Sequence, residues 1–132
     1  MTTPCVCVAL RQASRKLTAA YDEALQPAGI SLAQYSLLKK INRHGPVSLT
    51  ALAAIVDLDR STLGRNLRVL ERQELVALGS GKDLREARVT LTAPGRATLQ
   101  RAIPLWETAQ ESITNKLGAS GVAQLEALLG AL

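Results

Sequence analysis

The chain has 132 residues, of which 47% are hydrophobic but only 2% aromatic, with no Phe, one Trp and two Tyr. This length points to one domain or one protomer of a small oligomer. A core of Leu, Ala, Val and Ile favours a mainly helical protein, because Leu and Ala are strong helix formers. No apolar run approaches the roughly 18 residues that a membrane span needs. No basic region precedes an apolar stretch at the N-terminus, so we expect neither a membrane span nor a signal peptide.

Charge is distributed unevenly along the chain. The net charge is +5, and residues 60–101 carry all of this excess, with nine Lys or Arg against four Asp or Glu. A concentrated positive segment suggests a polyanionic partner, most often nucleic acid, although a merely solvated charged face remains an alternative. The two cysteines stand two positions apart and form no disulfide framework, so a reducing, cytoplasmic location is expected.

The first predicted helix begins with Thr3 as N-cap and Pro4 at the first helical position. It ends at the turn formed by residues 27–29. Its apolar residues recur at steps of three and four, which is typical of a long amphipathic helix. These residues are Val6, Leu10, Ala13, Leu17, Tyr21 and Ala24.

Three shorter helices are predicted next from their capping residues. Ser31 and Gln34 make a capping box for a second helix, which the Gly45-Pro46 pair stops. Ser48 can cap a short third helix, and Asp59 is placed to cap a fourth over about residues 60–73.

The fourth helix has two contrasting sides. At about 100° per residue, Leu63, Leu67 and Leu70 fall within a sector of about 60°. The opposite side carries Ser61, Arg65, Arg68 and Arg72. Because the apolar side must pack inward, the arginines face outward. Two short helices joined by a tight turn, the second basic outside, make a helix-turn-helix.

Periodicity then changes from helical to alternating. Residues 75–78 and 87–91 are predicted to be two strands joined by a polar turn over residues 79–83. A β-hairpin attached to a helix-turn-helix forms a winged helix-turn-helix. Its tip carries Lys82, Asp83 and Arg85, and arginine at such a tip suits the negative potential of a DNA minor groove.

A long final region is predicted to be helical from Thr92 and Pro94. We expect Pro104 to kink this helix, Gly118 to end it and Ser120 to cap a last helix. The leucine-rich C-terminal end and the first helix carry more apolar surface than the winged unit can cover, so a two-fold dimer is expected. The predicted organisation is a dimerisation helix over residues 1–30, a winged helix-turn-helix over 31–92 and dimerisation helices over 93–132.

The order of these elements, together with "LERQELVALGSGKDLREARVTLTAPG" at residues 70–95, resembles the MarR family of bacterial transcriptional regulators. The resemblance implies dimers that bind near-palindromic double-stranded operators, commonly as repressors released by small phenolic ligands or oxidants. It also implies that Arg85 enters the minor groove and that Asp83 orients it. "DRSTLGRNLRVLE", residues 59–71, is similar to the family's recognition helix. Gly64 departs from that pattern, which usually has a larger polar residue there.

Roles can be assigned along the fourth helix from its orientation. Ser61, Thr62 and Arg65 lie in the first turns, which usually contact base edges, and Arg65 suits a bidentate contact with guanine. Arg60, Arg68 and Arg72 suit phosphates. The alternative for Arg68 and Arg72 is pairing with nearby acids, including Glu71 and Glu74. The charges of Lys82 and Arg88 can also serve solubility alone.

Cys5 and Cys7 admit two interpretations. On one ideal helix, residues two apart point in different directions, so a disulfide between them would be strained, and the single His44 is too little for a zinc site. The first interpretation is small hydrophobic side chains at the dimer interface. The second is a thiol sensor, because residues 7–21 resemble the organic-hydroperoxide-sensing branch of the family. There Cys7 aligns with the reactive cysteine and Tyr21 with a tyrosine that bonds the thiol across the dimer. Two further tyrosines of that branch are replaced by Arg11 and Leu32.

No enzyme, metal or cofactor is predicted. The chain has one histidine and no Ser/His/Asp set, and its turn "GSGKD" departs from a phosphate loop at Val76 and Asp83. The rival to a DNA-binding regulator is a winged-helix protein-interaction module that does not bind DNA. A small-molecule effector, if there is one, would occupy the cleft between the dimer helices and the winged unit, with Tyr35, Arg11 and Arg15 as candidate lining residues.

Overall fold

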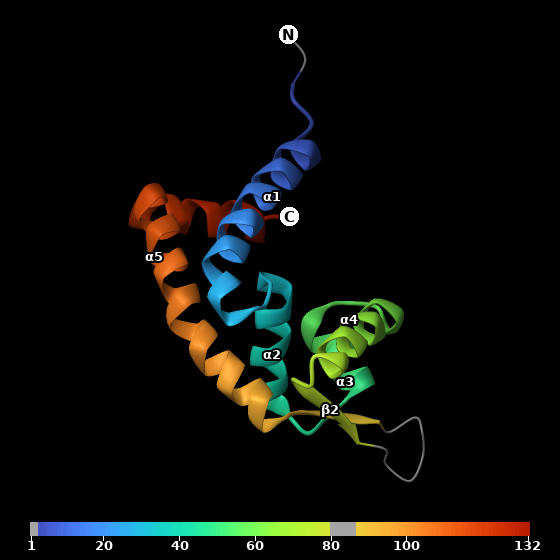
Figure 1. Cartoon of the computed structure of the whole chain (residues 1–132). Coiled ribbons are helices and arrows are strands. Elements are labelled where there is room, and N and C mark those ends of the chain that lie inside the picture. The colour runs from blue at the N-terminus through green and yellow to red at the C-terminus, as the bar shows by residue number, and fades with distance from the viewer. Residues whose placement is uncertain (1–2, 80–86) are drawn as a thin grey trace.

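The computed structural model of the chain describes residues 3–79 and 87–132, and it is mainly helical with one small sheet (Figure 1). The elements in chain order are α1 Val6–Leu25, a 3-10 turn Gln26–Ala28, α2 Leu32–His44, β1 Val47–Ser48, α3 Leu49–Val56, α4 Arg60–Arg72, β2 Val76–Gly79, β3 Arg88–Leu91 and α5 Ala93–Gly130. None of the helices within these ranges is both long and apolar enough to cross a membrane.

The winged unit consists of α2, α3 and α4 beside a three-stranded antiparallel sheet. Strands β2 and β3 pair as the expected hairpin, with Val76 opposite Leu91 and Gly79 opposite Arg88. The sheet order is β1-β3-β2, and the third strand was not predicted. Strand β1 has only two residues, and Val47 pairs with Val89 far along the chain. Neither local periodicity nor length could identify such a strand.

One continuous hydrophobic core fills this winged unit. Leu38, Leu52, Leu63 and Leu70 are fully buried where α2, α3 and α4 meet. The sheet contributes Val47, Val76, Val89 and Leu91 to the same cluster. Helix α1 adds only Leu25 as a buried residue, and α5 adds Gly95, Thr98, Leu99 and Ala102, all near its start. The core therefore lies almost entirely between the end of α1 and the start of α5.

The predicted caps at the starts of α2, α3, α4 and α5 are confirmed. Ser31 and Gln34 form both bonds of the capping box at α2. The side chain of Ser48 accepts from the backbone N–H of Ala51, and the side chain of Thr92 accepts from the N–H of Gly95. Each such bond satisfies an N–H that the first helical turn leaves free. These local bonds set the points at which α2, α3 and α5 begin.

The beginning of α1 differs from the prediction. The helix starts at Val6, and Cys5 is its N-cap in an extended conformation without a side-chain capping bond. Thr3 and Pro4 therefore do not start the helix. Every residue from Thr3 to Ala20 is exposed in this chain, so ordering two more residues at this end would bury nothing to offset the loss of conformational entropy.

Helix α5 is interrupted at Gly118 and not at Pro104. Gly118 has φ 74° and ψ 159°, a conformation open to glycine, whereas Pro104 lies inside helical backbone. Pro104 has no N–H, so the carbonyl of Gln100 loses its helical hydrogen-bond partner. Both residues are exposed, so water can bond to that carbonyl instead. Helical geometry resumes directly after Gly118, so Ser120 lies inside the last helix and does not cap it.

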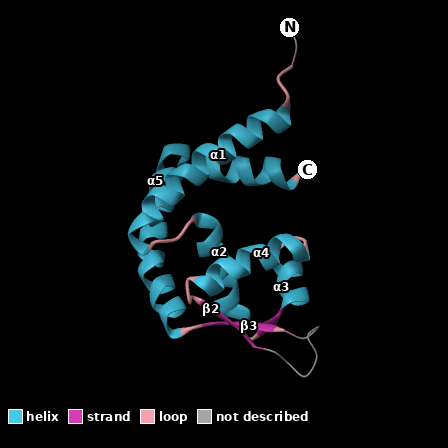
Figure 2. Cartoon of the chain, turned by 45° about the vertical axis from the view of Figure 1, so that its right-hand side comes forward, coloured by secondary structure: helices cyan, strands magenta, loops and turns pink. Residues whose placement is uncertain are grey.

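The interruption gives the chain its shape. The first part of α5 runs along the winged unit, and the part after Gly118 turns across to lie near α1 (Figure 2). Both termini lie at this end of the molecule, away from the sheet (Figure 1). We call α1 residues 6–20 and α5 residues 119–130 the arms.

Gly95 explains how α5 meets the hairpin. A Cβ atom at this position would collide with the carbonyl oxygen of Leu75. The same carbonyl accepts the N–H of Thr92, and the Thr92 hydroxyl donates to the carbonyl of Glu74 at 2.6 Å. The start of α5 is thus fastened directly to the start of β2, and only glycine allows this approach.

Candidate nucleic-acid interface

Helix α4 has one buried side and one basic side, as its sequence predicts. Leu63, Leu67 and Leu70 are at most 1% exposed, and they hold the helix against α3 and β2. The side chains of the opposite side are exposed, and these are Arg60, Ser61, Arg65, Arg68 and Arg72. Thr62 is half-buried. Anchoring by three leucines fixes the direction in which the guanidinium groups point.

The first turn of α4 contains a chain of three hydrogen-bonded residues. Asp59 caps the helix, since its Oδ1 accepts from the backbone N–H of Thr62 at 2.8 Å. Its Oδ2 accepts from the Thr62 hydroxyl at 2.9 Å. The Thr62 Oγ1 in turn accepts from Nη2 of Arg65 at 3.3 Å. We call these three residues the Asp59 relay.

The electrostatics of Asp59 follow from these contacts. Hydrogen bonds from the backbone and side chain of Thr62 lower the pKa of the Asp59 carboxyl, and the positive charge of Arg65 lowers this pKa further. Asp59 is therefore held as a carboxylate, which can only accept hydrogen bonds. The Arg65 guanidinium thus lies in the field of a fixed negative charge.

Further along α4, several charged side chains surround one shallow depression. Its lining residues are Arg65, Arg68, Val69, Glu71 and Arg72. Glu71 is the one acidic residue in this lining. The depression offers three guanidinium groups to an approaching anion.

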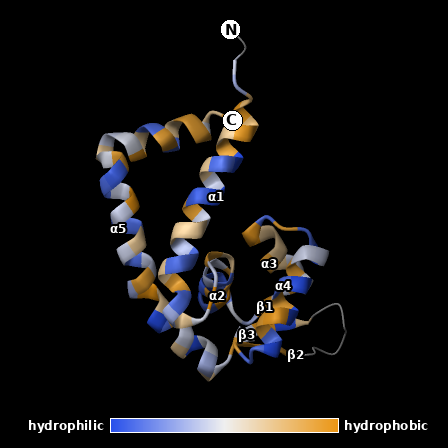
Figure 3. Ribbon diagram, turned by 45° about the horizontal axis from the view of Figure 1, so that its top comes forward, coloured by the Kyte–Doolittle hydropathy of each residue, from blue (hydrophilic) through white to orange (hydrophobic). Residues whose placement is uncertain are grey.

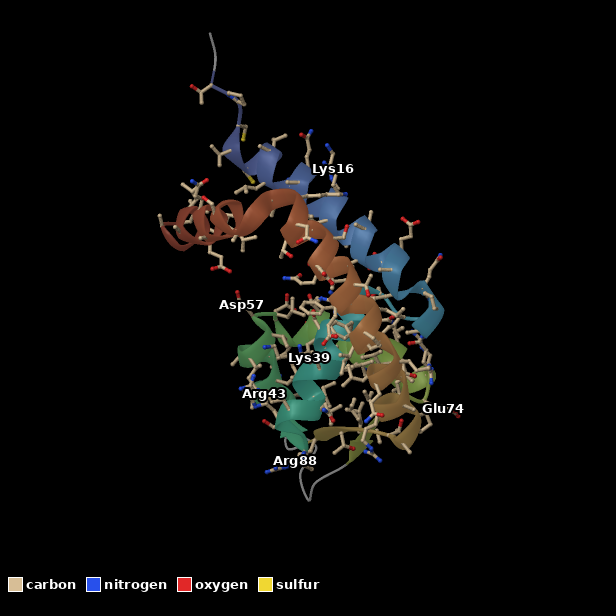
Figure 4. All side chains as sticks on the ribbon, turned by 90° about the vertical axis from the view of Figure 1, so that its left-hand side faces the viewer. Lys16, Lys39, Arg43, Asp57, Glu74 and Arg88 are labelled. Carbon is tan, nitrogen blue, oxygen red and sulfur yellow. The ribbon has the colours of Figure 1, made fainter. Side chains whose placement is uncertain are left out.

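Strand β3 adds one further basic side chain. Arg88 is exposed at the first position of β3, and Figure 4 shows it at the end of the winged unit that lies away from α1. Lys82, Asp83 and Arg85 lie outside the described residues. Their predicted roles at the wing tip stay predictions.

The two cysteines occupy different backbone environments. Both Cys5 and Cys7 are free and exposed, but only Cys7 lies within α1, because Cys5 is the extended N-cap. The expectation that both stand on one helix is therefore wrong. The helical-geometry argument against joining the two sulfurs does not apply to Cys5.

Tyr21 is engaged within its own chain. Its hydroxyl donates to Oε1 of Gln110 on α5, and burial raises the pKa of this hydroxyl. Along α1, Tyr21 stands about 21 Å from Cys7 at the usual helical rise. The structure therefore brings Tyr21 to α5 and not to the cysteines of the same chain.

The three aromatic residues of the chain form one stack, which sequence reasoning missed. The Trp106 ring on α5 stacks on Tyr35 of α2 at 5.8 Å and on Tyr21 of α1 at 6.3 Å between centroids. The Lys39 Nζ lies 5.2 Å from the Trp106 ring centroid and 5.8 Å from that of Tyr35. The only feature of the sequence that set these three residues apart was the scarcity of aromatic residues.

A groove opens beside this stack between α2 and α5. Its lining includes Tyr35, Lys39, Lys40, Arg43 and Trp106, and its volume is about 510 Å³. Figure 4 shows Lys39 and Arg43 projecting from α2 on one side of the winged unit. Tyr35 is only 2% exposed, and its hydroxyl has no hydrogen-bond partner among the described residues. Burial, and then the negative charge of Glu107, raise the pKa of Tyr35.

Metal-ligating side chains do not converge anywhere in residues 3–79 and 87–132, where no three His, Cys, Asp or Glu residues come together. The described part of the chain instead presents a basic helix, two strands of a β-hairpin and an aromatic groove.

Known proteins share both the sequence and the architecture. The MarR family matches residues 30–77. The transcriptional regulator MosR of M. tuberculosis, solved in complex with DNA, is 41% identical, with 97% of this chain and 95% of that chain covered and a TM-score of 0.83. A cysteine-to-serine variant of MarR from E. coli, complexed with operator DNA, is 27% identical, with 96% and 91% covered and a TM-score of 0.84.

A curated relative agrees with these two structures. The uncharacterized HTH-type transcriptional regulator YhbI of Bacillus subtilis is 28% identical over 109 residues, which are 82% of this chain and 71% of that protein. Sequence similarity of this extent, together with the winged fold and its outward basic helix, leads to one assignment: the chain belongs to the MarR family.

Proposed function

We propose that the chain is a homodimeric transcriptional regulator that binds double-stranded DNA through α4 and the wing. One observation carries this proposal: Leu63, Leu67 and Leu70 are buried, so Arg65, Arg68 and Arg72 of the same helix stand exposed together. A basic helix of this kind suits the major groove, where arginine can contact guanine and phosphate. The DNA complexes of the MosR and MarR relatives support it.

The dimer follows from the surface of the arms. Val6, Val8 and Leu10 on α1 are 37% to 63% exposed, and Leu128 and Leu129 on α5 are 69% and 45% exposed. Figure 3 shows hydrophobic segments on both arms, at the end of the molecule where the termini lie. A two-fold axis through this end would cover both arms and place two α4 helices on successive half-sites of a near-palindromic operator.

The test of DNA binding is an anisotropy titration of a labelled duplex taken from directly upstream of the coding sequence. A regulator gives log affinity that falls linearly with log salt, because phosphate contacts release counterions. A winged-helix protein-interaction module, the alternative function, shows no salt-dependent binding to this duplex or to any other.

Two matched variants test the division of roles along α4. Arg65→Ala should relax the preference for the operator over a shuffled duplex, since a bidentate contact with guanine discriminates by about 1–3 kcal/mol. Arg68→Ala should weaken both duplexes about equally, as loss of a phosphate contact does. Uniform losses in both variants would remove Arg65 from base recognition.

The predicted role of Arg85 is tested in the same titration. We expect Arg85→Ala to weaken operator binding by about 1–3 kcal/mol and to leave the dimer intact. Equal affinity of variant and parent would exclude the wing from the interface.

Repression that is released by a small ligand is the regulatory mode we propose first. The groove beside the aromatic stack supports it, because the buried Tyr35 hydroxyl has no hydrogen-bond partner within residues 3–79 and 87–132 and Lys39 lies over the rings. A planar ligand with a hydrogen-bonding group suits such a groove. Tyr35→Phe should leave DNA affinity unchanged and weaken release by an effector.

Oxidation of Cys5 and Cys7 is the second mode. Both thiols are exposed, which gives a peroxide access to them. Treatment with an organic hydroperoxide should then lower DNA affinity in the parent and not in the Cys5→Ser/Cys7→Ser variant. Binding that is indifferent to hydroperoxide assigns the cysteines to packing.

A further inference from the structure

The Thr62 hydroxyl has a fixed direction in this structure. A hydroxyl carries one proton and two lone pairs. Its proton goes to Oδ2 of Asp59, at 2.9 Å, because a carboxylate can only accept. The lone pairs are then free on the other side, where Nη2 of Arg65 donates to the same oxygen at 3.3 Å.

We propose that Asp59 is a positioning residue for Arg65, which it holds through the Thr62 hydroxyl so that the guanidinium is oriented on α4 before DNA binds. This rests on the proposed function, because it assigns sequence discrimination to the residue expected to read a base. It goes beyond helix capping, because capping uses only the bond from the Thr62 backbone N–H to Oδ1.

An oriented arginine should discriminate better than a free one. Ordering a flexible, exposed side chain when it binds costs free energy, and holding it in advance removes part of that cost. The gain applies where Arg65 meets its base and not where it only attracts phosphate. The relay should therefore raise the operator affinity relative to other sequences by about two- to tenfold.

Asp59→Asn separates capping from positioning. Asparagine is as good an N-cap as aspartate, so its amide oxygen can keep the bond from the Thr62 N–H. The NH2 group then takes the place of Oδ2 and can only donate. It turns the Thr62 hydroxyl around, so that the hydroxyl proton faces Arg65 and the relay is broken.

Asp57→Asn is the matched control for charge. Asp57 lies in the turn just before α4 with φ 55°, a conformation that asparagine tolerates. Both variants remove one negative charge from the same turn, but only Asp59 contacts Thr62 in the relay. Thr62→Val removes the hydroxyl without any change of charge, and Thr62→Ser restores it.

The experiment measures the ratio of affinities for two duplexes. One is the duplex that the wild-type chain enriches from a random pool, and the other is the same duplex shuffled. Thermal unfolding first shows that each variant folds. We expect Asp59→Asn and Thr62→Val each to lower the ratio about two- to tenfold, while Thr62→Ser and Asp57→Asn keep the wild-type ratio. With Arg65→Ala already present, Thr62→Val should lower it no further.

The contrary outcomes are distinct. Wild-type ratios in Asp59→Asn and Thr62→Val overturn the relay and leave Asp59 as a cap alone. If Asp57→Asn lowers the affinity ratio as much as Asp59→Asn does, the effect is due to charge. If Thr62→Val still lowers the ratio in a chain that already carries Arg65→Ala, the effect is due to a direct contact of Thr62 with DNA. Each of these overturns the inference while DNA binding stands. If the wild-type chain enriches no duplex, the proposed function itself fails.

Discussion

The winged unit and the arms are built from the same kinds of residue, yet only the winged unit is complete within one chain. Five of its leucines on α2, α3 and α4 are at most 1% exposed, and these are Leu38, Leu52, Leu63, Leu67 and Leu70. The arms carry leucine and valine at similar density, but every residue of α1 from Val6 to Ala20 is exposed. Amphipathic periodicity thus shows which side of a helix is apolar and leaves open whether its own chain covers that side.

The largest difference between the two regions should appear when a leucine is shortened. Leu38 has no exposed surface, so Leu38→Ala should lower the free energy of unfolding by about 2–5 kcal/mol through lost burial and a new cavity. Urea unfolding at fixed protein concentration measures this loss. A loss below about 1 kcal/mol would show that the winged unit is less closely packed than its burial indicates.

Substitutions in the arms should weaken the association of two chains and leave the folding of the winged unit unchanged. Replacing both Leu128 and Leu129 by Glu places two charges on an apolar surface, so the dissociation constant of the dimer should rise by about 100-fold or more. Sedimentation equilibrium measures the change. Ile55→Glu is the control, since Ile55 is also an exposed hydrophobic residue but lies on α3. Equal effects at both sites would break the distinction between the two regions.

Gly95 and Gly64 can be compared in the same way, because the packing of this chain requires glycine only at position 95. Gly95→Ala forces a methyl group against the Leu75 carbonyl and should destabilise the fold by about 1–3 kcal/mol. A Cβ at Gly64 on α4 would meet nothing, so Gly64→Ala should stabilise the fold by about 0.5–1 kcal/mol through helix propensity. Thermal unfolding measures whether each substitution lowers or raises the stability of the fold. A loss of stability in Gly64→Ala would contradict the open space seen there.

The smallest effect expected is a pH dependence at the start of α4. Hydrogen bonds from Thr62 lower the pKa of Asp59 in the folded chain from its ordinary value of 3.8. A lowered folded pKa adds stability above the unfolded pKa, and this stability is lost as the pH falls through the folded value. The stability difference between the parent and Asp59→Ala should therefore shrink below pH 3.8. A difference that stays constant across this range would show that the ionised carboxylate adds nothing to the cap.

Local signals in the sequence were sufficient for most helix boundaries of the winged unit. Ser31 with Gln34, Ser48, Asp59 and Thr92 each cap the helix that follows, because a cap acts within three residues of itself. The orientation of α4 followed from the spacing of Leu63, Leu67 and Leu70. The caps and the orientation of α4 could be predicted because each depends on residues close together in a single helix.

Features that depend on distant segments could not be predicted in this way. Strand β1 exists because Val47 meets Val89, and the aromatic stack exists because α1, α2 and α5 converge. Pro104 was expected to kink α5 and Gly118 to end it; the backbone leaves helical geometry at Gly118, whereas Pro104 lies inside helical backbone. The roles assigned to the DNA-facing side chains stay predictions, since they concern a partner molecule.

The aromatic stack also gives the chain an optical reporter. Trp106 is its only tryptophan. It stands where Tyr21, the α1 residue just after the arm, meets α2 and α5, and the Lys39 ammonium lies beside its ring. Indole emission responds to nearby charge and to stacking partners, so its intensity and wavelength report on this junction alone. Any motion between arms and winged unit can therefore be followed by fluorescence, in the unlabelled wild-type chain.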